Sequence, residues 1–293
     1  MTRTIGFIGT GVMGEPMCRN LARKSGLSVI AYDRSAAPLT RLATAGVRSA
    51  ASLQDLSADC DIIFMVLPSG RHVEEVCEGE NGLVAIARPG QVIVDLGTSP
   101  VSLAKRLAKA LGERGATFAD APIARTRQAA EDGTLSIMVG ASSETFAALQ
   151  PLLACIGSQI SHCGPVGSGQ LIKILNNMVL IETVVALAEA LAIARRNGLD
   201  GAVLFDTLTK GSADSFALRN HGIKAMLTGS FPEQAFSVEY ALKDLDYAFD
   251  LARDAGLTLS GATAARAKLA AAIEAGFGKQ YWPVIAKLID GQF

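Results

Sequence analysis

The stretch Ile5–Arg34, IGFIGTGVMGEPMCRNLARKSGLSVIAYDR, contains the pattern that decides the fold of this 293-residue chain. An apolar strand-like run leads into Gly9, Gly11 and Gly14, spaced as G-x-G-x-x-G, and a helical segment follows them. A second strand-like run then ends at Asp33. Strand, glycine loop, helix and a second strand with an acidic end are typical of a dinucleotide-binding βαβ unit.

Each residue type in this unit has a physical reason. Gly9 permits a tight turn, Gly11 lets the backbone approach a pyrophosphate, and Gly14 lets helix and strand pack closely. Asp33 is expected to bind the adenosine ribose hydroxyls and to repel a 2′-phosphate, which favours NAD. Arg34 beside it could attract that phosphate, so NADP remains an alternative. A strand-to-helix turn without any ligand is the structural alternative.

The rest of the chain divides into two parts. Strand-like and helical segments alternate through the first half, which predicts a largely parallel sheet covered by helices. After residue 164 the strand pattern ends, and residues 171–198 form an almost wholly apolar helical stretch. We therefore predict a Rossmann-type NAD(P)-binding domain over residues 1–164 and an all-α substrate and oligomerisation domain over 165–293, joined by a long interdomain helix.

The composition and charge of the chain argue against a nucleic-acid-binding or membrane protein. The formal net charge is -1, so the chain has no broad basic field for nucleic acid or an anionic membrane. Glu182 and Glu189 within the apolar helix favour a buried helix over a membrane span, and a helix apolar on all sides predicts a homodimer or homotetramer. The cysteines are scattered and form no paired motif, which predicts a cytoplasmic protein. The histidines lack the spacing of metal ligands, so we expect no metal site.

Three polar residues interrupt the apolar helix at one end. Lys173 is followed by Asn176 and Asn177, and the i, i+4 spacing places the ammonium and one amide on the same helix face. Reduction of a carbonyl by hydride leaves negative charge on its oxygen, which a nearby acid must neutralise. Lys173 is a candidate for that acid, with Asn177 fixing its position. A lysine that extends from the helix edge to solvent is the alternative.

Further candidates lie where strands end and on a later helix. Because ligands of open α/β sheets bind beyond the carboxyl ends of the strands, Leu67, Pro68 and Thr98 are expected to face the nucleotide, although ordinary turns remain an alternative. Lys243, followed by two aspartates, is by pattern alone a solvated helical face.

Four ordered motifs together resemble the β-hydroxyacid dehydrogenases, a family that includes 3-hydroxyisobutyrate dehydrogenase and sulfolactaldehyde reductase. These motifs are GFIGTGVMGEPMCRNL, DAP followed by GTLSIMVG, the pattern G-x-x-G-x-G-Q-x-x-K-x-x-x-N-N over residues 164–177, and the KDL that begins at Lys243. The resemblance implies a Rossmann-type domain, a long interdomain helix and a helical domain.

The resemblance also implies roles for individual residues. Lys173 matches the catalytic lysine, Asn177 the amide beside it, and Lys243 a lysine that reaches the cofactor and substrate region. Asn176 is assigned with them to the substrate site. The implied nucleotide contacts are Val12, Met13, Asp33, Leu67, Pro68 and Thr98. Imine reductases are close relatives that generally lack this lysine, so Lys173 favours carbonyl chemistry.

The chain departs from the family pattern after the DAP motif. Most relatives have a valine-serine-glycine-glycine segment that holds a carboxylate, whereas this chain has Ile123, Ala124, Arg125 and Thr126. The arginine-threonine pair resembles that of sulfolactaldehyde reductases. An arginine offers a rigid fork of donors to a carboxylate or sulfonate. We expect Arg125, with Thr126 and Ala124, to bind the anionic end of the substrate, although Arg125 could instead turn outward and pair with Glu131 or Asp132.

The sequence thus predicts an NAD(P)-dependent oxidoreductase that interconverts a short anionic aldehyde and its hydroxy acid. A glyoxylate, succinic semialdehyde or imine reductase is an alternative within the superfamily. A nucleotide-binding dimer without catalysis is a third hypothesis, which the presence of Lys173 and Asn177 disfavours.

Overall fold

The computed structural model describes residues 3–233 and 235–291, and these form two compact units, Met1–Lys173 and Ile174–Phe293. The two units are described separately below. The predicted boundary at residues 164/165 stays a prediction.

The first unit is built on a mainly parallel sheet, as predicted. Within the described residues its strands are β1 (Thr4–Ile8), β2 (Ser28–Tyr32), β3 (Arg48–Ser49), β4 (Ile62–Met65), β5 (Val92–Asp95), β6 (Thr117–Asp120), β7 (Ile123–Ala124), β8 (Leu135–Gly140) and β9 (Gly157–Gly164). The strand order is β3-β2-β1-β4-β5-β6-β8, and both β7 and β9 pair with β8. Only the pairs β6–β8 and β7–β8 are antiparallel among the described strands.

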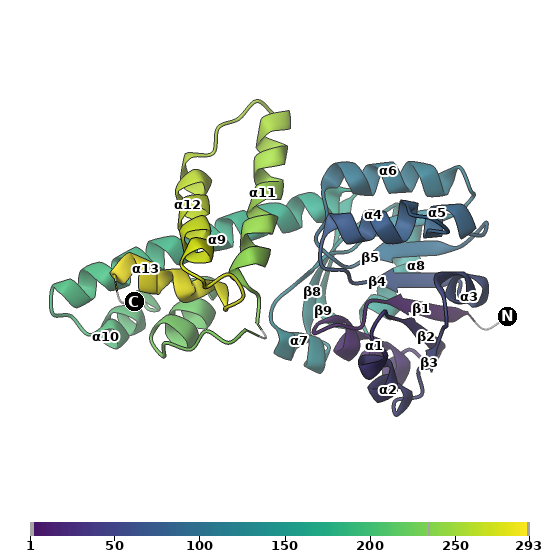
Figure 1. Ribbon diagram of the computed structural model, residues 1–293, viewed down its shortest axis with the longest axis horizontal. Helices are drawn as coiled ribbons and strands as arrows, with labels where there is room; N and C mark the ends of the chain where they lie inside the picture. The colour runs from purple at the N-terminus through teal and green to yellow at the C-terminus, as the bar shows by residue number, and fades with distance from the viewer. Residues whose placement is uncertain (1–2, 234, 292–293) are drawn as a thin grey trace. The chain divides into compact units, whose positions relative to one another are not determined.

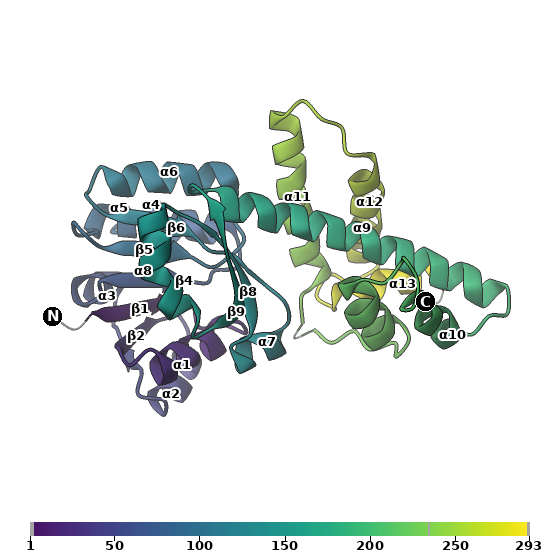
Figure 2. The same ribbon diagram turned by 180° about the vertical axis from the view of Figure 1, so that it is seen from behind.

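Helices cover both faces of this sheet. They are α1 (Gly14–Lys24), α2 (Ala36–Ala43), α3 (Leu53–Asp59), α4 (Gly70–Glu78), α5 (Leu83–Ile86), α6 (Val101–Gly112), α7 (Arg127–Asp132) and α8 (Ser143–Leu153). One core lies between the sheet and α1, α2, α7 and α8, and the other lies under α3, α4, α5 and α6. Figure 1 shows α1 and α2 on one side of the sheet and α4 and α6 on the other, and Figure 2 shows β8 and β9 side by side.

The strand order identifies the edge of the sheet where a ligand can bind. The chain runs outward from β1 to β2 and β3, then returns to β4 on the other side of β1. The register pairs Ile8 at the end of β1 with Met65 at the end of β4. Ligands of doubly wound sheets bind beyond the carboxyl ends of the strands at this switch point. The glycine loop after β1 and the segment after β4 therefore meet there.

Helix α7 is short and is not evident from the sequence. The polar stretch AEDG at residues 130–133 resembles a turn, but residues 130–132 complete this helix. The Thr126 hydroxyl accepts a hydrogen bond from the Ala129 N–H at the start of this helix, and Gly133, at φ 70°, ends it. The side-chain cap and the left-handed glycine stabilise a helix too short to show periodicity.

Apart from an isolated antiparallel bridge between Ser237 and Tyr281, the regular elements in the described residues of the second unit are helices. It contains most of α9 (Ser168–Arg196), then α10 (Gly201–Leu208), the π-helical segment η1 (Leu218–Met226), α11 (Val238–Asp254), α12 (Ser260–Glu274), a 3₁₀ turn η2 (Trp282–Val284) and α13 (Ile285–Asp290). Figures 1 and 2 both show α11 and α12 as an antiparallel pair.

Helix α9 confirms the predicted long apolar helix. It is the one helix in the described residues that is long and apolar enough to cross a membrane, and half of its most apolar window is buried inside the structure. A core helix of a soluble protein passes the same test, so this finding is weak evidence for a membrane span. Leu175, Val179 and Ile193 of α9 remain exposed.

Candidate active site

The glycine loop has the geometry that its pattern predicts. Gly9 has φ 85°, and a Cβ on it would lie 2.2 Å from the carbonyl oxygen of Val66. A Cβ on Gly14 would lie 1.9 Å from the carbonyl oxygen of Gly9. A side chain at either position would therefore displace backbone, so both glycines are required by the fold itself.

Gly11 differs from these two glycines, because a Cβ on it would meet nothing within 4 Å. Helix α1 begins just beyond it, and no side chain caps that N-terminus. Val12, next to it, is 51% exposed, although it is apolar. The open backbone at Gly11 and the uncapped N–H groups at the start of α1 fit the pyrophosphate of a dinucleotide. The exposed Val12 lies next to this open backbone.

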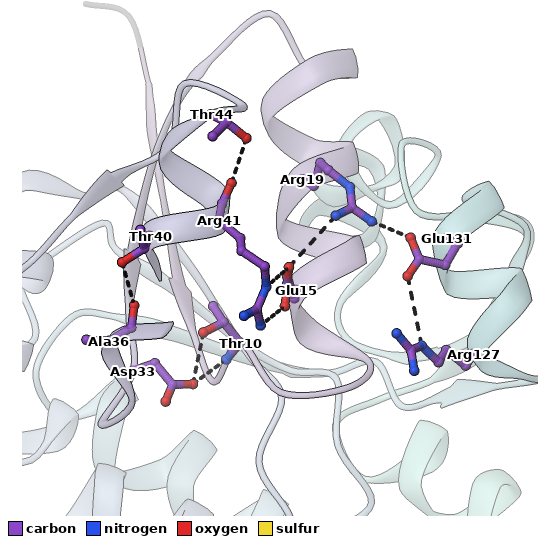
Figure 3. Close-up of polar contacts among 10 residues, drawn as sticks. All are labelled: Thr10, Glu15, Arg19, Asp33, Ala36, Thr40, Arg41, Thr44, Arg127 and Glu131. Atoms are coloured by element: carbon purple, nitrogen blue, oxygen red, sulfur yellow. Dashed lines mark hydrogen bonds and ion pairs between the residues drawn. The ribbon is translucent and has the colours of Figure 1, made fainter. Parts of the chain in front are cut away.

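Asp33 holds the glycine loop in place. Its Oδ2 accepts hydrogen bonds from the backbone N–H of Thr10 at 2.6 Å and from the Thr10 hydroxyl at 3.0 Å, as Figure 3 shows. Its Oδ1 accepts from the backbone N–H of Ser35 at 2.8 Å. An ionised carboxylate has about four acceptor sites, so this one retains capacity for a ribose hydroxyl. Arg34 beside it is exposed.

The other predicted nucleotide contacts lie at neighbouring strand ends of the same unit. Leu67 follows β4, and a Cβ on Gly97, after β5, would lie 3.2 Å from the Leu67 carbonyl oxygen. Leu67 and Thr98 are half-buried, whereas Pro68 is exposed. The segments after β1, β4 and β5 therefore meet along one edge of the sheet, as the strand order requires.

Two buried carboxylates at strand ends hold the start of helix α9. Asp120, at the end of β6, accepts hydrogen bonds from the backbone N–H groups of Gly167 at 2.6 Å and Gln170 at 2.7 Å. The Gln170 amide donates to the Gly97 carbonyl at 2.9 Å and to Asp95 Oδ2 at 3.3 Å. Burial raises the pKa of Asp120, and the N–H groups of Gly167 and Gln170 oppose that rise by stabilising its charge.

Our sequence interpretation missed these anchors. The signal was present, because VIVD and TFAD both end an apolar strand in a carboxylate, and Gln170 lies directly before the apolar helix. Asp120 is fully buried, and Asp95 and Gln170 are at most 1% exposed. Lys173 follows Gln170 by three residues and is itself only 9% exposed. Its position therefore depends on the hydrogen bonds at the start of α9.

The two asparagines on α9 have partners within the chain. The Asn177 amide donates to Asp244 Oδ2 on α11 at 2.6 Å, and the Asn176 amide donates to Asn177 Oδ1 at 3.1 Å. Lys243 Nζ forms an ion pair with Asp244 Oδ1 at 2.8 Å. Asp244 is 2% exposed and was also missed.

The sequence pattern alone predicted a solvated helical face for Lys243, but the structure shows that its side chain is partly buried. Its side chain is 23% exposed, and its ammonium lies 5.7 Å and 5.2 Å from the ring centroids of Tyr240 and Tyr247. Asp246, two residues beyond Asp244 and on another face, pairs with Arg266 of α12. The predicted contact of Lys243 with the cofactor stays a prediction.

Arg125 has an unusual backbone conformation. Its φ is 90°, a region that side chains rarely adopt; Asn81 is the other described non-glycine residue with positive φ. Its guanidinium is exposed and donates to the Thr134 carbonyl at 2.9 Å. It does not pair with Glu131 or Asp132. The resemblance placed Arg125 at a glycine position of the family, and the positive φ explains why glycine suits that position.

The neighbours of Arg125 are less distinctive. Ala124 is half-buried in β7, and Thr126 is exposed with its hydroxyl engaged as the α7 cap. Arg127 is exposed and lies 3.9 Å from Glu131, as a surface charge would. Among the residues that the structure describes, no three His, Cys, Asp or Glu side chains lie together as metal ligands would.

Comparison with known proteins assigns this chain to a protein family. The family model of the NAD binding domain of 6-phosphogluconate dehydrogenase matches residues 4–164. The model described as the NAD-binding of NADP-dependent 3-hydroxyisobutyrate dehydrogenase matches residues 167–288. The chain belongs to the β-hydroxyacid dehydrogenase family. This β-hydroxyacid dehydrogenase is therefore an NAD(P)-dependent oxidoreductase, as its glycine loop predicts.

Relatives with named activities cover most of the chain. The 2-(hydroxymethyl)glutarate dehydrogenase of Eubacterium barkeri is 36% identical over 87% of this chain and 84% of its own length. The NAD-dependent L-serine dehydrogenase of Pseudomonas aeruginosa is 30% identical over 98% of both proteins. A solved structure of Mycobacterium tuberculosis 3-hydroxyisobutyrate dehydrogenase with L-serine has a TM-score of 0.89 and 28% identity, and covers 99% of each chain.

Proposed function

We propose that this β-hydroxyacid dehydrogenase interconverts a short aldehyde with an anionic end and the corresponding hydroxy acid, with NAD as the preferred cofactor. The observation that carries the substrate class is Arg125, a charged residue in a backbone conformation that glycine adopts most easily. Strained residues that the surrounding structure retains are concentrated at functional sites. The relatives named for 2-(hydroxymethyl)glutarate and L-serine act on molecules that carry carboxylates, which supports an anionic substrate.

Proton transfer is assigned to Lys173. The nicotinamide, when bound, supplies hydride to the carbonyl carbon or takes it from the carbinol carbon. In reduction the Lys173 ammonium donates a proton to the carbonyl oxygen and recovers one from solvent. In oxidation the neutral amine takes the hydroxyl proton. Lys173 is 9% exposed and follows the anchored start of α9, so its side chain is confined, as a positioned proton donor requires.

Asn177 is assigned to orient the lysine or the substrate hydroxyl from one helical turn away. Its side chain is held by Asp244, and that leaves its rotamer little freedom. Asn176 and Lys243 are assigned as further substrate contacts, and the resemblance implies this role for Lys243. The pyrophosphate is assigned to the N–H groups around Gly11, Val12 and Met13.

Arg125 is assigned to the carboxylate or sulfonate of the substrate, with Thr126 and Ala124 forming the adjoining backbone. Its hydrogen bond to the Thr134 carbonyl uses Nη1, which leaves Nε and Nη2 to donate to an anion. A sulfonate has three acceptor oxygens and stays ionised, so an aldehyde of the sulfolactaldehyde type is the finer proposal. Glyoxylate and succinic semialdehyde remain alternatives.

The test is a steady-state panel with NADH and NADPH against sulfolactaldehyde, tartronate semialdehyde, methylmalonate semialdehyde and succinic semialdehyde. We expect one anionic aldehyde to be favoured and Arg125→Gly to lower its kcat/KM by ~10- to 100-fold, as expected for the loss of a charge-assisted hydrogen bond pair. An equal loss with every aldehyde of the panel in Arg125→Gly, or no loss with any of them, would contradict the anion site. A strong preference for NADPH would contradict the NAD assignment.

We also propose a homodimer or homotetramer in the cytoplasm. The outward face of α9 carries exposed Leu175, Val179 and Ile193, which a partner subunit would cover. Sedimentation at micromolar concentration tests this, and a monomer would contradict it.

A further inference from the structure

An arginine on α2 is held by a carboxylate on α1. Arg41 Nε donates to Glu15 Oε1 at 2.9 Å, and Arg41 Nη2 donates to Glu15 Oε2 at 2.7 Å. This is the parallel, bidentate geometry of a strong arginine–carboxylate pair. Figure 3 shows Arg41 extending from α2 to Glu15 on α1.

The pair lies beside the part of the first unit that receives the adenosine ribose. Glu15 is in the first turn of α1, and its N–H donates to the carbonyl of Gly11 at 3.0 Å. Helix α2 begins at Ala36, directly after the Asp33, Arg34 and Ser35 segment that follows β2. The contact of Asp33 with Thr10 joins the same two segments of chain, the glycine loop and the end of β2.

An arginine in this place would ordinarily favour NADP. NADP differs from NAD by a phosphate on the adenosine 2′-oxygen, and an arginine near the end of the second strand accommodates that phosphate in Rossmann-type domains. Arg41 is 59% exposed and thus accessible, but Glu15 already accepts from Nε and Nη2, which form one of the two edges of the guanidinium that can make a bidentate contact. A 2′-phosphate would have to displace that carboxylate and would also be repelled by it.

Glu15 is itself well held in its charged form. Arg19, one turn further along α1, lies 3.9 Å from Glu15 Oε1 and pairs on its other side with Glu131 of α7. The hydrogen bond from Arg41 lowers the pKa of Glu15, and the charges of Arg41 and Arg19 add to that effect, while burial opposes it. Glu15 therefore stays ionised at neutral pH.

We propose that Glu15 is a specificity-determining residue, which disfavours NADP by holding Arg41 away from the 2′-phosphate. This inference rests on the proposed nucleotide site at the glycine loop. It separates two contributions to the choice of cofactor: the ribose contact proposed for Asp33, and the neutralisation by Glu15 of Arg41, which with the exposed Arg34 is one of two arginines that follow the second strand.

The experiment measures binding of two nucleotide fragments by calorimetry, adenosine 2′,5′-bisphosphate and 5′-AMP, so it requires neither a substrate nor turnover. For Glu15→Ala we expect ~10-fold tighter binding of the bisphosphate, the gain typical of one new arginine–phosphate contact, with 5′-AMP changed by less than ~3-fold. Glu15→Ala combined with Arg41→Ala should lose the gain. Glu131→Gln removes a carboxylate of the same network that does not touch Arg41, and should leave both affinities unchanged.

The outcomes separate this inference from the proposed function. Unchanged or weaker bisphosphate binding in Glu15→Ala, or a gain that persists without Arg41, overturns the role of Glu15. If the wild-type protein binds the bisphosphate more tightly than 5′-AMP, the proposed preference for NAD fails first. Thermal unfolding of each variant shows whether it is folded, and Glu15→Gln, which removes the charge and keeps the side-chain length, replaces Glu15→Ala if that variant is not.

Discussion

The buried carboxylate of Asp120 accepts a hydrogen bond from the backbone N–H of Gln170 at 2.7 Å, across 50 residues of sequence. Asp120 ends a strand, and Gln170 is in the first turn of α9. The bond satisfies one of the N–H groups that every helix leaves unpaired at its start, and it places a negative charge at the positive end of the helix. Lys173 follows one turn later, so its placement depends on this contact.

Asp120→Asn should lower both stability and turnover. Its amide nitrogen would place a donor against the N–H group of either Gly167 or Gln170, and a buried donor left without an acceptor costs about 1–3 kcal/mol. We expect the free energy of unfolding to fall by that amount and kcat to fall more than KM changes. Urea unfolding and steady-state kinetics measure the two effects. Asp132→Asn, on the exposed end of α7, should change neither; equal effects of both variants would contradict the anchoring role.

Lys173→Ala should lower kcat by ~10²–10⁴-fold, the range typical of a general acid or base. Binding of NADH, followed by fluorescence titration, should stay within a few-fold of wild type, because the glycine loop is untouched. Turnover close to wild type would remove Lys173 from proton transfer.

Arg125→Gly should raise stability while it weakens substrate binding. A side chain at φ 90° carries strain of about 1–2 kcal/mol, which glycine relieves, although the greater freedom of glycine in the unfolded chain returns about 0.5–1 kcal/mol. Differential scanning calorimetry should show an equal or higher Tm. Asn81→Gly is the matched control: asparagine tolerates its φ of 56°, so the gain should be smaller. A clear loss of stability in Arg125→Gly would show that the guanidinium mainly supports the fold.

Asp244→Ala should be much more destabilising than Asp246→Ala, two residues away on α11. The first removes the buried partner of Asn177 and Lys243, and breaking a buried pair costs about 3–5 kcal/mol, less here because Lys243 is partly exposed. The second removes an exposed pair with Arg266, which contributes about 0–1 kcal/mol. Urea unfolding of the two variants compares them directly, and similar losses would contradict the assigned burial of Asp244.

His221 should make the protein acid-sensitive. It is 6% exposed and lies 2.5 Å from the Tyr281 hydroxyl, and burial lowers its pKa to about 4. Between that value and about 6.5 the unfolded chain binds the proton and the folded chain does not, so stability falls as pH falls through this range. The loss for a shift of this size is at most about 3 kcal/mol. His221→Gln should flatten the dependence in urea unfolding from pH 4.5 to 7, and an unchanged slope would assign the effect to other groups.

The fold and the geometry of the glycine loop could be predicted because their signals are local. Gly9 and Gly14 are required by contacts within one βαβ unit, and the spacing of Lys173 and Asn177 follows from the geometry of a single helix. Helix α7 is not evident from the sequence, because its six residues are too few for a helical period to show. Arg125 was recognised as a departure from the family pattern, but its positive φ was not foreseen.

By itself, then, the sequence determined the alternation of strands and helices, the glycine loop and the helix with Lys173, because each depends on residues close together in the chain. Only the tertiary structure showed which carboxylates hold these parts: Asp120 on Gln170, Asp244 on Asn177, and Glu15 on Arg41. A carboxylate at the end of a strand or on a helix has the same pattern whether it faces water or a partner far along the chain. Burial and the approach of distant segments decide between the two, and a local pattern contains neither.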